Sequence, residues 1–241
     1  MQGRYLLLLV GLLGKSLVSL GQQNANLPGF IPSVFYRGHI SNRFDYNIFA
    51  STTIAQAKST ADGKAGRVRE SEIYLQPSLV YKYSKELNMT AGYTFIRTGN
   101  FPASAETEQQ VWQQIIFEHG ALRGAMLHRF RMVENINANV SPSINYQFAF
   151  EKPLQGRMLE EGEFYFTCFN ESFINLSPGA SRIYPANWSF AGIGYMTSRA
   201  GKLEVGPLVQ TTFHNQTEGR TTLYLLQILW TADLKILHPK R

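Results

Sequence analysis

The chain has 241 residues, of which 44% are hydrophobic and 17% are charged, and its formal net charge is +6. The basic residues are scattered along the sequence, which argues against a nucleic-acid-binding protein. A soluble domain and a membrane β-barrel both fit this composition, because only every second residue of a barrel strand meets lipid.

Residues 1–21 predict a cleaved secretory signal peptide. Arg4 supplies a basic start, residues 5–13 form an apolar core, and Ser19 and Gly21 are small residues before the expected cleavage site. A retained membrane anchor is the alternative, but Lys15 interrupts the apolar run. No later stretch approaches the roughly 18 apolar residues of a helical span. We therefore expect an exported domain, 22–241, that can enter a membrane only with strands.

Long alternating segments follow one another along the exported domain. In the clearest one, Ile73, Leu75, Leu79 and Tyr81 share one face of a strand. Runs of about 10 to 14 residues exceed the usual soluble strand of about 5 or 6, and they suit a tilted bilayer crossing of about 9 to 11. The segments lie at 34–40, 43–54, 72–83, 87–95, 108–119, 121–135, 143–151, 163–171, 188–197, 203–214 and 221–234.

This pattern predicts an all-β fold, a single antiparallel transmembrane β-barrel. Eleven segments are visible, but single-chain bacterial barrels have even strand numbers, so we expect about twelve strands, with ten as the next choice. Residues 22–33 are the candidate for an unrecognised strand or lumenal segment. Residues 58–69 are expected to form a loop, and Pro77 predicts a bulge. The face of segment 108–119 stays ambiguous, because Val111 and Trp112 lie on opposite parities.

The apolar parity predicts the residues that face lipid. Tyr224 and Trp230 are candidate anchors at the membrane interface. After the last strand, Pro239 cannot extend a ladder, so the end of the chain is expected to form a short periplasmic tail. The candidate lipid-facing residues are Ile73, Leu75, Tyr81, Tyr146, Phe148, Phe164, Phe166, Tyr224, Leu226, Ile228 and Trp230.

The opposite parity carries charges of both signs and predicts a charged lumen. Such residues either pair and fill the interior or line a water-filled pore, in which Arg129 and Arg131 would attract anions. Glu163 and Glu171 are the expected partners of these arginines, whose planar groups bind carboxylates with two hydrogen bonds. The candidate network is Arg37, Arg43, Glu72, Arg123, Arg129, Arg131, Glu163, Glu171, Glu204 and Asp233, and Asp45 and Lys82 share its parity.

Four short motifs occur in a fixed order: Gln110-Val111-Trp112-Gln113-Gln114, His128-Arg129-Phe130-Arg131, Phe169-Asn170-Glu171-Ser172-Phe173 and Ala191-Gly192-Ile193-Gly194-Tyr195. In these motifs the chain resembles a domain-of-unknown-function family of outer-membrane β-barrel proteins of Bacteroidetes and other Gram-negative bacteria. The resemblance covers about residues 30 to 235. It implies a bacterial outer-membrane location and a barrel fold, and it implies no particular activity.

Catalytic signals are weak. The five histidines include His128, which the alternation places outward or at the interface, and no Gly-x-Ser-x-Gly elbow, metal-ligand spacing or phosphate loop occurs. Cys168 is the only cysteine and cannot form an intramolecular disulfide. We therefore expect no enzyme, cofactor or metal, and a structural or accessory role in an envelope assembly, with lipid and other envelope proteins as partners. A small passive channel with an anion preference is the alternative, and a lipid hydrolase or acyltransferase is the third.

Overall fold

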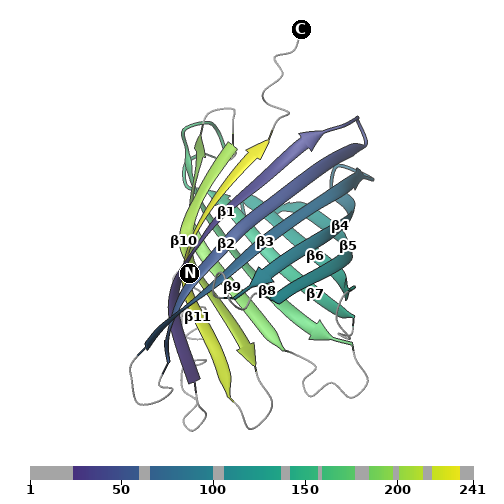
Figure 1. Cartoon of the computed structure of the whole chain (residues 1–241). Coiled ribbons are helices and arrows are strands. Elements are labelled where there is room, and N and C mark those ends of the chain that lie inside the picture. Colours follow the sequence, from purple (N-terminus) through teal and green to yellow (C-terminus); the bar gives the residue numbers. More distant parts are fainter. Residues whose placement is uncertain are drawn as a thin grey trace.

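In a computed structural model, the described residues of the chain form a closed β-barrel of eleven strands (Figure 1). It describes residues 24–59, 66–99, 106–136, 142–156, 159–176, 185–197, 201–213 and 219–233. The predicted signal peptide and the predicted C-terminal tail lie outside these ranges. Within them, the structure contains no helix long and apolar enough to cross a membrane.

The strands follow one another around the barrel in chain order, steeply tilted to its axis. Their bounds are β1 Asn24–His39, β2 Phe44–Ser59, β3 Gly66–Lys82, β4 Leu87–Thr98, β5 Glu106–Ala121, β6 Gly124–Asn135, β7 Ser143–Pro153, β8 Phe164–Asn175, β9 Ala186–Thr197, β10 Gly201–Phe213 and β11 Arg220–Asp233. Neighbours in sequence pair antiparallel, whereas β1 and β11 close the barrel as a parallel pair. An odd number of alternating strands makes this parallel closure necessary, because the first and last strands then run in the same direction.

The prediction of a single all-β barrel is confirmed, and the eleven segments read from the alternation correspond to the eleven strands. The eleven strands lie between the two predicted strand numbers, about twelve and ten. Residues 24–33 do not form a separate strand, because they are the first part of β1, where Leu27 pairs with Leu223 of β11. The even-number rule applies to barrels that are closed by an antiparallel pair of strands, whereas this barrel is closed by a parallel pair.

Two local predictions are wrong. The segment 58–69 is not all loop: β2 runs to Ser59 and β3 starts at Gly66. Pro77 does not cause a bulge, because the β3–β4 register is the same at Leu75–Phe95 and at Ser78–Gly92 on either side of it. Pro77 interrupts the described pairing with β4 without adding a residue, and its ring lies on the outer face.

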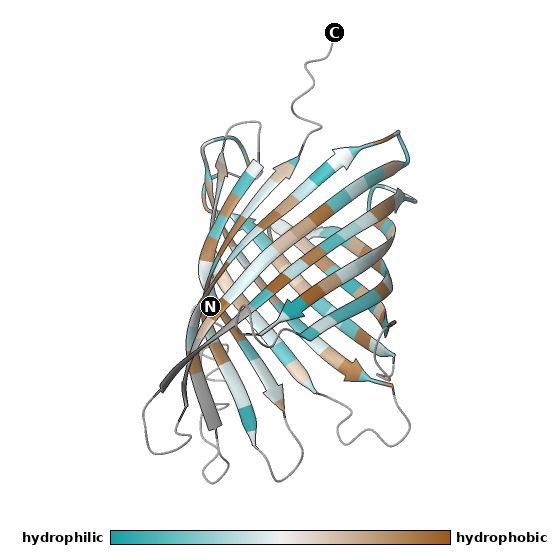
Figure 2. Cartoon of the chain, in the orientation of Figure 1, coloured by the Kyte–Doolittle hydropathy of each residue, from teal (hydrophilic) through white to brown (hydrophobic). Residues whose placement is uncertain are grey.

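The two faces of the barrel wall differ in polarity, and the alternation is visible along the strands in Figure 2. Ile115 (47% exposed), Phe130 (55%) and Leu226 (46%) point outward, whereas Gln76, Gln114 and other polar side chains are buried inside. The structure also resolves the ambiguous strand β5, in which Trp112 is inward and buried, while Val111 is outward and exposed.

A packed apolar cluster of the interior lies on one wall of the barrel. Ile31 of β1, Phe190 of β9, Leu208 of β10 and Leu225 of β11 are packed together and almost fully buried, with Phe169, Trp188 and Leu223 against them. The polar groups described next include a network on β3 to β8, on the wall opposite to the β1–β11 seam, and smaller clusters elsewhere around the barrel.

Candidate functional site

An inward-facing network around the guanidinium group of Arg131 joins strands β3 to β6. Arg131 Nε donates to Gln114 Oε1 over 2.8 Å, and the guanidinium carbon lies 4.2 Å from the centre of the Trp112 ring. The Trp112 indole N–H donates to Thr94 Oγ1 over 2.9 Å. With its amide turned so that the oxygen faces these donors, Gln76 accepts from Arg131 and from Trp112 at 2.9 and 3.0 Å. A cation is thus held by an aromatic face and neutral acceptors.

Arg129, two residues earlier on β6, extends this network across β7 to β8. One of its terminal nitrogens donates to Glu171 Oε1 over 2.7 Å, and the Glu171 side chain is almost fully buried. Among the described residues no carboxylate forms an ion pair with Arg131. The Nε of Arg129 and the Oδ1 of Asn145 are buried without a hydrogen-bond partner in the described part of the chain. The network therefore has two guanidinium groups and one close carboxylate, an excess of positive charge.

A second inward cluster joins β7, β8 and β10. The Tyr165 hydroxyl donates to Glu204 Oε1 over 2.7 Å, and both residues are buried. Lys202 Nζ forms an ion pair of 2.5 Å with Glu151 Oε2 and lies 5.2 Å from the centre of the Tyr165 ring. A cavity of about 580 Å³ adjoins this cluster, lined by residues 120–125 of the β5–β6 hairpin, by Glu151 and by Tyr165.

The inward rings of Tyr165 and Trp112 each lie over a glycine on the neighbouring strand. Tyr165 of β8 is paired with Gly194 of β9, and Trp112 of β5 is paired with Gly92 of β4. A Cβ atom built on either glycine would overlap the ring. The glycines therefore give the rings room to lie along the inner wall, where their polar atoms reach Glu204 and Thr94.

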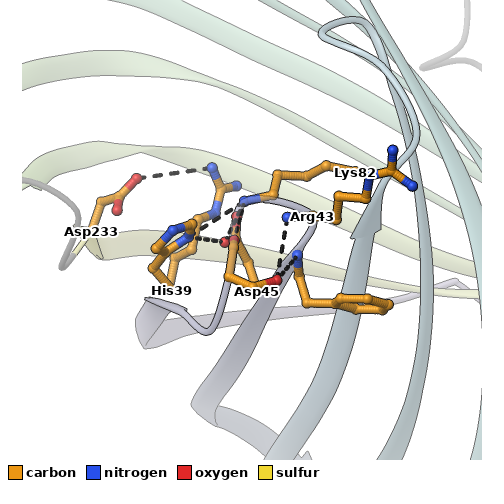
Figure 3. Close-up of polar contacts among 8 residues, drawn as sticks. His39, Arg43, Asp45, Lys82 and Asp233 are labelled. Atoms are coloured by element: carbon orange, nitrogen blue, oxygen red, sulfur yellow. Dashed lines mark hydrogen bonds and ion pairs between the residues drawn. The ribbon is translucent and has the colours of Figure 1, made fainter.

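A third cluster lies at the end of the barrel where β1 and β3 finish (Figure 3). Asp45 is buried between two donors, with Oδ1 at 2.7 Å from His39 Nδ1 and at 2.8 Å from Lys82 Nζ. Lys82 also donates to the Ser41 carbonyl over 3.2 Å. These contacts fasten the β1–β2 turn, residues 40–43, to the end of β3.

The parallel seam has its own pair of charges at the same end. Arg37 of β1 and Asp233 of β11 are paired across the seam, and their charged groups are 4.0 Å apart (Figure 3). Both side chains are partly exposed, so this ion pair contributes at most about 1 kcal/mol. The ion pair is weak, but it marks the junction at which the first and last strands meet.

Seven of the ten predicted lumen residues lie on the inner face of a strand, but they form separate groups. Arg129, Arg131 and Glu171 belong to the first network, Glu204 to the second cluster and Arg37 with Asp233 to the seam, whereas Glu72 lies near the other end of the barrel, paired with Thr98. Three lie in turns outside these groups. Arg43 and Arg123 are exposed, and Glu163 accepts from the Glu160 backbone N–H. The expected pairing of an inner arginine with Glu171 is present, and that with Glu163 is not.

The predicted lipid-facing residues all lie on the outward face. Ile73, Leu75, Phe164, Tyr224 and Leu226 are exposed, whereas Tyr81, Tyr146, Phe148, Phe166, Ile228 and Trp230 are partly covered by neighbours on the same face. His128 is also outward. It stacks on His119, with ring centres 5.5 Å apart, and its Nδ1 lies 2.9 Å from the Tyr146 hydroxyl. His214 and His238 lie outside the described residues.

Charge patterning alone does not find the neutral members of the first network. Gln76, Thr94, Trp112 and Gln114 carry no charge, and only their inward parity, once the strand faces are known, brings them together. Three of the four motifs singled out in the sequence converge here, because the first supplies Trp112 and Gln114, the second both arginines and the third Glu171. The fourth supplies Gly194, which lies under the Tyr165 ring in the second cluster.

A comparison against protein-family models confirms the predicted resemblance to a family of unknown function, because one such model matches residues 32–221. The chain belongs to the family described as "Protein of unknown function (DUF2490)". No curated protein and no solved structure matches the chain. Because the description of the DUF2490 family states no function, the role of the chain has to be inferred from the site.

The chemistry available to this DUF2490 barrel is that of a hydrogen-bonded interior. The described residues contain no group of three or more His, Cys, Asp or Glu side chains that could hold a metal ion. Its inward groups are suited to holding charges in place, through ion pairs and cation–π contacts, and to binding an anion if one enters.

Proposed function

We propose that this protein is an outer-membrane β-barrel whose lumen is closed by its own side chains, and that it acts as a structural or accessory component of the cell envelope. The proposal rests on the polarity of the closed barrel wall, which is apolar on its outer face and polar on its inner face. Large apolar side chains such as Leu79, Ile115 and Phe130 are outward and 47 to 55% exposed, while Gln, Glu and Thr side chains are buried inside. Water-soluble monomers rarely expose so large an apolar surface, which a bilayer would cover.

The closed lumen is supported by the burial of the inward side chains. Trp112 and Glu171 are 6% and 5% exposed, and Phe190 and Leu208 on the other wall are 3% and 2% exposed. Residues that line a water-filled pore remain accessible to water. We therefore expect purified protein in a planar bilayer to give no unitary conductance.

A small anion-preferring channel is the second candidate, and the surplus positive charge of Arg129 and Arg131 favours it. In that case the bilayer experiment would show conductance steps with a reversal potential set by the anion gradient. Replacing Arg131 with glutamine would shift that potential toward zero. Silence of the wild-type protein under conditions where a control porin conducts excludes this candidate.

We also propose that the barrel is not an enzyme. The described histidines are engaged with other groups. His39 and Lys82 both bond the carboxylate of Asp45, and His128 stacks on His119 on the outer face of the barrel. Hydrolysis of labelled phospholipid or lipopolysaccharide by pure protein, lost when one histidine is replaced by alanine, would overturn this part of the proposal.

The membrane proposal is tested by placing a charge on the outer wall. Ile115 lies between Met89 and Phe130 in the strand register, all three being outward and exposed. An arginine at such a position costs about 2–4 kcal/mol at the bilayer midplane. We expect Ile115→Arg to fold into phospholipid vesicles far less completely than the wild type. Leu122→Arg, in the exposed β5–β6 turn, is the matched control and should fold normally. Equal folding of both variants would contradict the proposal.

A further inference from the structure

A groove of about 650 Å³ lies on the outer wall of the barrel, between β2 and β7. Its smallest lining side chain is that of Ala91 on β4, which is paired with Leu79 of β3 and with Gln113 of β5. Large outward side chains surround Ala91, so the wall is hollowed at this position. Apart from Gln113 they are apolar or aromatic, and they include Phe44, Tyr81, Met89, Ile115, Met132 and Ile144.

The groove reaches from one end of the barrel towards the other. Phe44 is the first residue of β2, at the end where β1 and β3 finish, whereas Ile144 is the second residue of β7, at the opposite end. Between them the lining residues follow the strand register, in which Phe44 is paired with Tyr81 and Met89 with Ile115. The groove therefore offers a continuous apolar track across the wall, which suits an extended hydrocarbon chain.

A positive charge lies at the end of the groove where β2 begins. Arg43 immediately precedes β2, and its carbonyl oxygen accepts a hydrogen bond from the Lys82 backbone N–H over 2.8 Å. The Arg43 side chain is exposed, and among the described residues it forms no ion pair. Lys82, by contrast, is bonded to Asp45 (Figure 3), and in the next turn the charges of Lys85 and Glu86 offset each other. The guanidinium group of Arg43 is thus available to a ligand.

We propose that the groove binds one acyl chain of an anionic phospholipid whose phosphate is held by Arg43. This inference rests on the proposed membrane location. A guanidinium group bonds a phosphate through two parallel hydrogen bonds, and a basic side chain at the membrane surface attracts anionic lipids. The hydrocarbon chain then extends from the phosphate along the groove. A zwitterionic lipid gains less at Arg43, because its head carries a positive charge of its own.

Two lipids that differ only in their heads test this proposal. The full chain, purified in a non-ionic detergent, is mixed with dioleoyl phosphatidylglycerol or with dioleoyl phosphatidylcholine, and native mass spectrometry measures the lipid that stays bound. We expect the dissociation constant for phosphatidylglycerol to be lower by about fivefold, the contribution of one basic residue near an anionic membrane surface. Glycerol phosphate, which has a phosphate and no acyl chain, should not bind.

Two substitutions separate recognition of the head from that of the chain. Arg43→Gln should weaken phosphatidylglycerol binding by about fivefold and leave phosphatidylcholine binding unchanged. Ala91→Phe places a ring in the groove and should weaken the binding of both lipids. The matched controls should bind as the wild type does: Arg123→Gln, in another exposed turn at the same end, and Ala191→Phe, on the outer face of β9 and outside the groove. Faster migration on a gel before boiling shows that a variant is folded, and Arg43→Gln, in a turn, tests the proposal even if Ala91→Phe does not fold.

Several outcomes would overturn the inference. They are equal affinity of the wild type for the two lipids, an Arg43→Gln variant that keeps the preference, an Arg123→Gln variant that loses it equally, and a folded Ala91→Phe variant that binds as the wild type does. A protein dimer in place of the lipid complex would assign the groove to a second copy of the chain. A chain that does not enter phospholipid vesicles contradicts the proposed membrane function, whereas an inserted chain without the lipid preference contradicts this inference alone.

Discussion

At the scale of single residues, the interior depends on matched neighbours on adjacent strands. Tyr165 reaches Glu204 only because Gly194 leaves the inner wall free beneath its ring, and Trp112 reaches Thr94 over Gly92 in the same way. A methyl group at either glycine would force the ring away from its hydrogen-bond partner.

We therefore expect Gly194→Ala to lower the free energy of unfolding by about 1–3 kcal/mol, the usual cost of overpacking. Gly120→Ala is the matched control, because the nearest atom to a Cβ there is 4.0 Å away. Urea unfolding in detergent micelles, followed by tryptophan fluorescence, measures both. Equal stabilities of the two variants would show that the ring does not need the glycine.

The buried ion pair between Arg129 and Glu171 makes a second residue-scale prediction. Removing one partner leaves a buried charge uncompensated, so Arg129→Gln or Glu171→Gln should each cost about 3–5 kcal/mol in stability. The double variant should cost much less than the two single losses added together. Additive losses in the same unfolding assay would mean that the two groups do not interact. Arg123→Gln, in the exposed turn, should change stability by less than about 0.5 kcal/mol.

The charged members of this site could be predicted from the sequence, and its neutral members could not. Alternation puts Arg129, Arg131 and Glu171 on the inner face, but which strands lie opposite one another depends on the register around the whole barrel. Arg43 and Arg123 share the parity of these residues and yet lie in turns, because parity identifies a face only while the chain remains in a strand.

At the scale of elements, the β5–β6 hairpin has an unusual turn. Leu122 and Arg123 both have positive φ, 53° and 62°, a conformation that favours glycine or asparagine. The turn is short enough to hold the hairpin register from Ala121–Gly124 onward. These two residues keep a strained backbone conformation. The short turn that they form holds β5 and β6 in the register on which the Arg131 network depends.

Relieving that strain should stabilise the barrel. We expect Leu122→Asn with Arg123→Gly to raise the free energy of unfolding by about 1–2 kcal/mol. Lys85→Gly, in the turn at 83–86, is the control and should bring no gain, because Lys85 does not have a positive φ. A double variant that is no more stable than the wild type in urea would contradict this interpretation of the turn.

The strands themselves were predictable, because each has one apolar and one mixed face over its length. The ends of the strands were less predictable. The polar residues 58–69 read as a loop, yet backbone pairing carries β2 and β3 through half of them, since hydrogen bonds between backbones do not depend on apolar side chains.

At the scale of the whole molecule, the parallel seam between β1 and β11 sets the strand number. The alternation shows eleven segments, and no local feature of the sequence says whether the first pairs parallel or antiparallel with the last. The general preference for even numbers therefore gave twelve. The seam is decided by the register of residues about 200 apart in the chain, such as Tyr36 with Ala232.

A disulfide across the seam tests the strand number. In a Cys168→Ser chain, Tyr36→Cys and Ala232→Cys are paired and outward, and oxidation should link them in the folded barrel. Tyr36→Cys with Leu226→Cys is the control and should stay reduced, because Leu226 pairs with Phe30. A twelfth strand between β1 and β11 would leave both pairs unlinked.

The proposed membrane location of this closed barrel is tested by the behaviour of the protein on extraction. Membranes from cells that express the full chain are washed with urea or carbonate, extracted with detergent and run on a gel with and without boiling. We predict that the protein stays with the membranes through the wash, dissolves only in detergent, and migrates faster before boiling than after it. Release by the wash without detergent, with a single band before and after boiling, would contradict a membrane location.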